Sequence, residues 1–328
     1  MILNAISDTN MAKLPEYTKL SEKESIFSCK TIDNPKAFDD AIAPLRNTQT
    51  TYFFRGVNEA KYKMYTSGQR EYIEKEYKKI CGCTYWNFVQ SLIRPLQQDK
   101  DLLQFYKAIN KNLSDSFFYT YLQHYGAPTP YIDFSTDIYV ALFFCAYKLQ
   151  QAPSDKEFDN YFSLYYIDNG MSKKGAILQT LYDSFKETER KREKKPLQEV
   201  FLDPNDQEKR KNKPQFFLTT KELNDISMFY INQEATLGTF AGSRIIYQIP
   251  NRNMIAQKGL LIYNNSETKP LEDMPMFQQK IRCLNIHKSL SDYIKTKCVN
   301  NGYTYDKLFP NEYYIARLAY QQFKNNPK

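Results

Sequence analysis

The sequence predicts an α+β fold in which helices are inserted into a mixed or antiparallel sheet. Apolar residues make up 42% of the 328 residues and aromatic residues 15%, which is enough to bury a core and argues against disorder. Segments with helical and with strand patterns follow one another without the strict β-α alternation of a parallel sheet. The longest apolar run, residues 138–147, is long enough for a buried helix and too short to span a bilayer.

The first elements lie before residue 70. The segment Asp33-Asn34-Pro35 combines an N-cap residue with a proline for the first helical turn, so we expect a helix from there to about Leu45. Residues 51–54, Thr-Tyr-Phe-Phe, are β-branched and aromatic and predict a strand, which ends in Arg55-Gly56.

A helical region follows from residue 70 to residue 123. The helical period is interrupted at Gly82, at Pro95 and near residues 110–114, so several helices are expected rather than one. Gly126 marks the end of the last of them.

The middle of the chain predicts a short strand that leads into a buried helix. Residues 131–134, Tyr-Ile-Asp-Phe, form the strand, and Asp137–Gln150 the helix. Either Ser135 or Thr136 is expected to be the N-cap.

The rest of the chain, after residue 160, predicts a mixture of strands and helices. Residues 196–214 have weak structural signals. Strands are expected at 161–167, 245–249, 260–263 and 281–286, and helices at 174–195, 289–299 and 311–323.

The scarce residue types exclude several common sites. No two of the ten glycines lie two positions apart, which excludes G-x-G-x-x-G, and Gly170 to Gly175 continues into Ala-Ile, which excludes a P-loop. His124 and His287 are the two histidines, so H-E-x-x-H and a three-histidine zinc site are absent, and no metal is expected. The six cysteines form no C-x-x-C pair and are expected to be reduced thiols, which indicates a cytoplasmic protein. Residues 1–8 show no secretory leader, and no membrane association is expected.

Part of the formal net charge of +8 is concentrated in residues 186–213, which hold ten basic and seven acidic side chains. Such a segment attracts nucleic-acid phosphates, or it is simply a solvated helix end and loop. The candidate contacts with RNA or single-stranded DNA are Arg190, Lys191, Arg192, Lys194, Lys195 and Arg210.

Residues 121–144 carry the richest chemistry. A Gln-His-Tyr cluster around His124 precedes a sharp reversal, and the strand then delivers Asp133, Ser135 and Thr136 to the start of the buried helix. The N-terminus of a helix favours an anionic group. Alternatively, the hydroxyl groups only cap the helix, Asp133 bonds local amides, and His124 is an interior histidine.

Several ordered motifs make the sequence similar to the FRG domain family. Residues 52–56 contain Phe-Arg-Gly, and residues 123–144 resemble the family's Q-H-Y-G-x-P-T-x-x-x-D-(W/F)-(S/T) segment and the helix after it. Residues 251–259 are similar to its R-x-x-x-x-Q-x-G element. Residues 67–70 resemble P-S-x-x-R, and Leu-Phe-Pro at 308–310 also fits.

The resemblance covers residues from about 48 to 324 and implies an N-terminal extension, 1–47, before an FRG-like domain, 48–328. Within that domain we expect a helical insertion at about 70–123 and a basic insertion at about 174–214. Two positions depart from the family: Thr66 stands where proline is usual, and Pro130 where arginine is common.

The order of the motifs also resembles ADP-ribosyltransferases of the Arg-Ser-Glu type, which implies an ADP-ribosyltransferase-like fold with NAD as the substrate. In that comparison Arg55 holds the pyrophosphate, and Ser135 and Thr136 line the ribose pocket. Tyr125 or Phe134 stacks on the nicotinamide. The cofactor-binding set is completed by Gly56 and Arg70.

The same resemblance implies the catalytic residues. Gln257 occupies the position of the family's glutamate, but an amide offers no negative charge to an oxocarbenium-like transition state. Asp133 or Glu234 then supplies the carboxylate, or transfer is slow or absent. His124 acts as a base toward the incoming nucleophile. The alternative for Arg55 is a structural ion pair, with Asp133 as its partner.

The implied function is that of a toxin or phage-defence effector that modifies RNA or DNA, with an antitoxin or another operon partner. The alternatives are a non-catalytic nucleic-acid or nucleotide-binding module and an interaction domain whose pocket is covered by an antitoxin.

Overall fold

The structure is a computed structural model that describes residues 13–46, 52–108, 115–147, 149, 156–168, 228–231, 244–245, 252–264, 266–274, 277, 279–310 and 320. Its centre is an eight-stranded sheet in the order β1-β8-β4-β2-β3-β7-β5-β6. The strands are β1 (Ser28–Ile32), β2 (Tyr52–Val57), β3 (Tyr131–Ser135), β4 (Tyr161–Asp168), β5 (Met228–Ile231), β6 (Arg244–Ile245), β7 (Gly259–Asn264) and β8 (Ile281–His287).

The sheet is mixed, as expected for an α+β protein. β1 runs parallel to β8, and β5 runs parallel to β7, while the other neighbouring pairs are antiparallel. β2, which carries the Phe-Arg-Gly residues, therefore lies in the middle of the sheet rather than at an edge.

The sheet opens between β2 and β3. β2 pairs with β4 along its whole length, and β3 pairs with β7 along its whole length. Between β2 and β3 the register contains one pair, Phe54 with Ser135. Beyond that pair the two halves of the sheet separate, directly beside Arg55.

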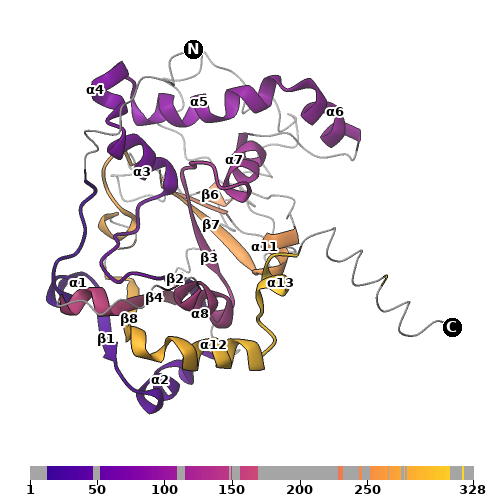
Figure 1. Ribbon diagram of the computed structural model, residues 1–328. Helices are drawn as coiled ribbons and strands as arrows, with labels where there is room; N and C mark the ends of the chain where they lie inside the picture. Colours follow the sequence, from indigo (N-terminus) through magenta and orange to yellow (C-terminus); the bar gives the residue numbers. More distant parts are fainter. Residues whose placement is uncertain are drawn as a thin grey trace, which may run out of the picture.

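Helices surround the sheet in two groups. Figure 1 shows α3 to α7 gathered at one end of the sheet, with α2, α8 and α12 at the other. The helices are α1 (Leu20–Ile26), α2 (Pro35–Ile42), α3 (Ser67–Glu74), α4 (Tyr77–Cys81), α5 (Tyr85–Gln98), α6 (Lys100–Ala108), α7 (Asp115–His124), α8 (Ile138–Ala146), α11 (Arg252–Ala256), α12 (Ser291–Asn300) and α13 (Tyr305–Leu308).

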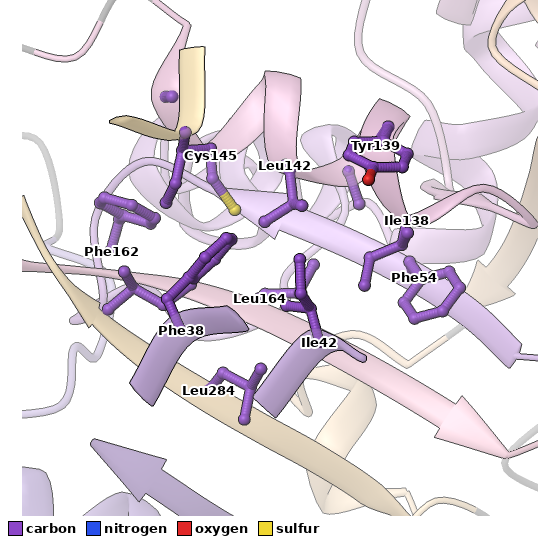
Figure 2. Close-up of a cluster of buried hydrophobic side chains, with 14 of the residues drawn as sticks. Phe38, Ile42, Phe54, Ile138, Tyr139, Leu142, Cys145, Phe162, Leu164 and Leu284 are labelled. Carbon is purple, nitrogen blue, oxygen red and sulfur yellow. The ribbon is translucent and has the colours of Figure 1, made fainter. Parts of the chain in front are cut away.

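α8 packs on one face of the sheet as its apolar sequence predicts. Figure 2 shows Leu142 and Cys145 of α8 directed toward Leu164 of β4 and toward Phe38 of α2. These side chains are buried, and together they fasten two helices to the strands. Burial of this kind stabilises the fold by roughly 25 cal/mol for each Å² of apolar surface removed from water.

The other face of the sheet is covered by α1 and by loops, and it contains a buried lysine. Lys23 is 0% exposed, and its ammonium group donates to Ser163 Oγ at 2.6 Å, to Asn285 Oδ1 at 2.7 Å and to Ala60 O at 3.2 Å. The ammonium also lies 4.7 Å from the centre of the Tyr165 ring. These contacts replace the water that the charge loses on burial.

The helical region that was expected at 70–123 forms its own core against the sheet. Tyr72, Tyr85 and Phe88 pack with Tyr131 of β3 and Leu261 of β7. This region is therefore anchored to the half of the sheet that contains β3 and β7.

The start of the buried helix differs from the expectation. Its N-cap is Asp137, neither Ser135 nor Thr136, and Asp137 Oδ1 accepts from the Tyr139 amide at 2.9 Å. The Ser135 hydroxyl is oriented elsewhere, because it donates to Gln257 O. The helix also ends at Ala146 rather than at Gln150, with Tyr147 extended.

Other differences concern elements of the N-terminal region and of β2. β2 continues to Val57, so Arg55 and Gly56 lie inside the strand rather than at its end. α1 and β1 were not expected, and they belong to residues 1–47, the segment expected to be an extension. The predicted helices at 174–195 and, apart from residue 320, 311–323 lie outside the described residues.

Within the described part of the chain, no helix combines the length and the apolar character needed to cross a membrane.

Candidate functional site

Arg55 lies where the sheet opens. Its Nη1 donates to Asp133 O at 2.7 Å, so the guanidinium bridges β2 and β3 just past their single paired position. Its Nε is buried, and no partner for it is found among the described residues. A buried N–H group without an acceptor costs about 1–3 kcal/mol, so this atom is a ready donor for an incoming oxygen.

Asp133 lies in the middle of β3, next to the opening. Its Oδ2 accepts from Gln123 Nε2 at 2.7 Å. Gln123 is itself oriented by Thr129, whose hydroxyl donates to Gln123 Oε1. The carboxylate is therefore held by the end of α7, and the Gln-His-Tyr segment contributes its glutamine to this arrangement.

Arg70, on α3, is the second arginine near Asp133. Its Nη1 donates to Tyr65 O at 2.9 Å. α3 begins with a capping box in which Thr66 and Gln69 each bond the backbone of the other. Thr66 is thus the N-cap of the helix that carries Arg70.

The electrostatics of the cluster reflect burial and mutual attraction. Burial raises the pKa of the Asp133 carboxyl, against the opposing effects of Arg55, the Gln123 hydrogen bond and Arg70. Burial lowers the pKa of Arg55, which Asp133 raises in turn. Burial likewise lowers the pKa of Arg70, against Glu74 and Asp133. The Asp133 side chain still reaches solvent, so its carboxyl is only partly desolvated. Two positively charged arginines act on one aspartate, so the cluster favours binding of an anion.

Ser135 belongs to the single pair that joins β2 and β3, and Gln257 lies just before β7. Both side chains form hydrogen bonds within the protein. Ser135 Oγ donates to Gln257 O at 2.7 Å and accepts from the Asp137 amide at 3.0 Å. Gln257 Nε2 donates to Leu308 O at 3.0 Å. These contacts join three of the motif segments, and they leave the Gln257 amide directed at backbone.

The other expected site residues are placed differently. Gly56 lies against α8, because a Cβ built on it would come 1.9 Å from Ala141 O. Phe134 is 3% exposed and belongs to the core, so it presents no ring for stacking. Thr136 is exposed, and its amide donates to Lys258 O at 3.1 Å. Tyr125 is 71% exposed and its ring lies 4.7 Å from that of Tyr121.

Some expected residues are not covered by the structure. His124 ends α7, but its side chain lies outside the described part. Glu234 and the basic candidates also lie outside the described residues; these basic candidates are Arg190, Lys191, Arg192, Lys194, Lys195 and Arg210. Where side chains are described, no group of three or more His, Cys, Asp or Glu residues is arranged to hold a metal ion.

Gln123 and Thr66 were missed as members of the site. Gln123 is the first residue of the Q-H-Y-G motif, so its place in the sequence was a signal, but its contact with Asp133 depends on how α7 ends beside β3. Thr66 appeared only as a departure from a motif, although its spacing to Gln69 is that of a capping box.

Comparison with known proteins identifies one domain. Residues 50–154, which include Arg55, Arg70, Gln123 and Asp133, match the FRG domain. No curated protein and no solved structure matches the chain.

Proposed function

We propose that this chain, which carries an FRG domain, binds NAD in the manner of ADP-ribosyltransferases, with Arg55 holding the dinucleotide phosphates. The observation that carries the proposal is the buried, unpartnered Nε of Arg55 at the opening of the sheet, among the described residues. A phosphate oxygen is an acceptor that matches a guanidinium in geometry and in charge.

The order of the strands supports the same proposal. β2 with Arg55, β3 ending in Ser135, and β7 preceded by Gln257 are consecutive neighbours in the sheet. Phe54, Ser135 and Gly259 stand in register across these three strands. Arg55 follows Phe54 directly, and Gln257 lies two residues before Gly259, so the arginine, serine and late polar positions of the Arg-Ser-Glu pattern lie at or close to one rung of the sheet.

Asp133 supplies the carboxylate in this proposal. It lies beside Arg55, whereas the Gln257 amide is bonded to Leu308 O and carries no charge. As the bond between nicotinamide and ribose breaks, positive charge develops on the ribose, and a nearby carboxylate stabilises it. Tyr125 is the exposed aromatic candidate for stacking on nicotinamide, since Phe134 is buried.

The acceptor and the biological role rest on the resemblance alone. A toxin or phage-defence effector acting on nucleic acid agrees with the basic residues near 190–210, which lie outside the described part of the chain. The competing function is a nucleic-acid or nucleotide-binding module in which Arg55 and Asp133 hold β2 and β3 together without catalysis.

Calorimetric titration of the full chain with NAD tests the proposal. We expect binding by the wild type, a loss of at least about tenfold with Arg55→Ala, and partial recovery with Arg55→Lys, which restores the charge but not the fork of donors. Arg94→Ala removes an exposed arginine on α5 and is the matched control. Absence of NAD binding by the wild type, or equal binding by Arg55→Ala, contradicts the proposal.

Two further measurements separate the competing functions. If Arg55 serves only as a structural residue, Arg55→Ala lowers the melting temperature strongly, whereas a ligand-binding arginine leaves it within a few degrees. For an enzyme, Asp133→Asn retains NAD binding and loses release of nicotinamide, measured by chromatography in the presence of RNA, DNA or protein acceptors. A binding module leaves NAD intact and binds single-stranded nucleic acid in a salt-dependent way.

A further inference from the structure

Two cysteines lie side by side where α4 ends and α5 is about to begin. Cys81 is the last residue of α4, Gly82 caps that helix with a φ of 63°, and Cys83 precedes Thr84, the N-cap of α5. This left-handed glycine turns the chain back on itself, and the two sulfur atoms lie 2.9 Å apart. None of the candidate NAD-binding residues belongs to this turn.

The two thiols differ in their surroundings. Cys81 is exposed, and its Sγ contacts Tyr77 O at 3.0 Å. Cys83 is half-buried, and its backbone carbonyl accepts from the Tyr72 hydroxyl of α3 at 2.7 Å. The Cys81 thiol is thus accessible to reagents in solution, and the backbone of Cys83 beside it is held in place by Tyr72.

We propose that Cys81 and Cys83 form a redox-active dithiol that exchanges with low-molecular-weight disulfides such as glutathione disulfide. The Cys81 thiolate attacks one sulfur of the external disulfide, a mixed disulfide forms, and one glutathione thiolate leaves. The Cys83 thiolate then attacks the Cys81 sulfur and releases the second glutathione. The protein dithiol is oxidised to an intramolecular disulfide, and one glutathione disulfide is reduced to two glutathione thiols.

The local geometry supports closure of this ring. The two sulfurs need to approach from 2.9 Å to the bonding distance of about 2.05 Å. A Cβ built on Gly82 meets no heavy atom within 4 Å, so the turn has free space on that side.

The electrostatics assign the roles of the two thiols. Interaction with the Cys83 side chain and with the Cys83 backbone lowers the pKa of Cys81, which favours Cys81 as the attacking thiolate. Burial and the neighbouring Cys81 charge raise the pKa of Cys83 to about 11. Once Cys81 is in the mixed disulfide, its charge no longer opposes ionisation of Cys83.

The other cysteines are poorer candidates. Cys145, Cys283 and Cys298 are buried, and Cys29 is half-buried on β1. Oxidation by a dissolved disulfide is therefore expected to select the turn between α4 and α5.

The test is equilibration of the full-length protein in glutathione buffers of increasing disulfide fraction, followed by acid quenching, alkylation and peptide mass spectrometry. We expect the peptide that contains residues 81–83 to lose two hydrogens and to escape alkylation, while the peptides with Cys145, Cys283 and Cys298 remain alkylated. Full alkylation of Cys81 and Cys83 in the most oxidising buffer overturns the proposal.

Single variants test the order of attack. Cys83→Ser is expected to trap a stable glutathione adduct on Cys81, because the resolving thiol is absent. Cys81→Ser is expected to react much more slowly at Cys83, and faster reaction there overturns the assignment. Cys29→Ser is the control and leaves the chemistry of residues 81–83 unchanged.

Discussion

At the scale of single residues, the neighbours Arg55 and Gly56 of β2 have different contacts and different roles. Arg55 extends into the opening between β2 and β3, where its Nη1 reaches Asp133 O. The position of Gly56 faces the opposite side of the strand, where a Cβ would collide with the backbone of α8. The Phe-Arg-Gly sequence therefore combines a charged group at the candidate site with the close approach of the helix that supports it.

Replacing Gly56 with alanine is expected to destabilise the protein. The added Cβ would lie 1.9 Å from Ala141 O and 2.8 Å from Cys145 Sγ, so α8 must move away from β2. Overpacking of this kind typically costs about 1–3 kcal/mol, and urea denaturation monitored by circular dichroism measures it. Gly259→Ala is the matched control, because its Cβ would meet Met254 O at 3.5 Å, an ordinary contact. Equal stability of Gly56→Ala and the wild type contradicts this account of the glycine.

Asp133 is expected to make stability depend on pH. Its carboxyl has a raised pKa in the folded state, so the folded protein holds this proton more tightly than the unfolded chain, whose Asp pKa is about 3.9. The stabilising contribution is complete below that value and is lost as the pH rises through the folded pKa. Relative to the wild type, Asp133→Asn should therefore gain stability as the pH rises above about 4, the pKa of the carboxyl in the unfolded chain, as measured by denaturation at several pH values. The opposite trend would mean that Arg55 and Arg70 outweigh burial.

At the scale of secondary structure, α8 depends on Asp137 for more than its N-cap. Asp137 Oδ2 accepts from Lys258 Nζ at 2.7 Å and from the Tyr303 hydroxyl at 2.5 Å. The start of α8 is thereby joined to the segment before β7 and to the segment after α12. The carboxylate at this N-terminus is also favourable to the helix dipole.

Asp137→Ala is expected to cost about 0.5–2 kcal/mol for the cap alone, and more through the lost contacts with Lys258 and Tyr303. Thr136→Ala is the matched control, since Thr136 is exposed and is not the cap, and it should change the free energy of unfolding by less than about 0.5 kcal/mol. Thermal denaturation of both variants decides between the two positions. A larger loss of stability with Thr136→Ala than with Asp137→Ala would show that Thr136 is the N-cap, as the sequence suggested.

Most elements could be predicted where their signal is local. The aromatic and β-branched segments at β4, β7 and β8 lie where the sequence indicates them, and so does α2, with its Asn34 cap and Pro35 in the first turn. β1, Ser-Cys-Lys-Thr-Ile, has little alternation and is a strand because β8 pairs with it. Its formation depends on a partner far along the chain, which a local pattern does not contain.

The candidate site was predictable in its residue types but not in its contacts. Arg55, Arg70 and Asp133 could be selected from motifs, and the structure brings them together. Phe134 could not be excluded from the sequence, because the side of β3 that it faces depends on the register with β7. Similarly, the bond from Gln257 to Leu308 O joins segments that only the tertiary fold places side by side.

At the scale of the whole molecule, the residues that match the FRG domain do not contain a complete sheet. Residues 50–154 include β2 and β3, which share one paired position, but neither β4 nor β7, their main partners. A fragment of these residues is expected to lack cooperative unfolding, because the unpaired strand edges and the apolar faces are left exposed. Differential scanning calorimetry of the fragment and of the full chain provides the comparison. A sharp transition in the fragment would show that it folds alone.

The pairing of β1 with β8 also has a consequence for the order of folding. Ser28 lies beside Arg282, although the two are separated by most of the chain, whereas β2, β3 and β4 are much closer together in sequence. During synthesis, β1 leaves the ribosome before the other described strands and has no pairing partner until β8 has been made. Contacts of such long sequence separation close slowly. The first strand of the sheet to be translated is thus expected to be among the last to be incorporated.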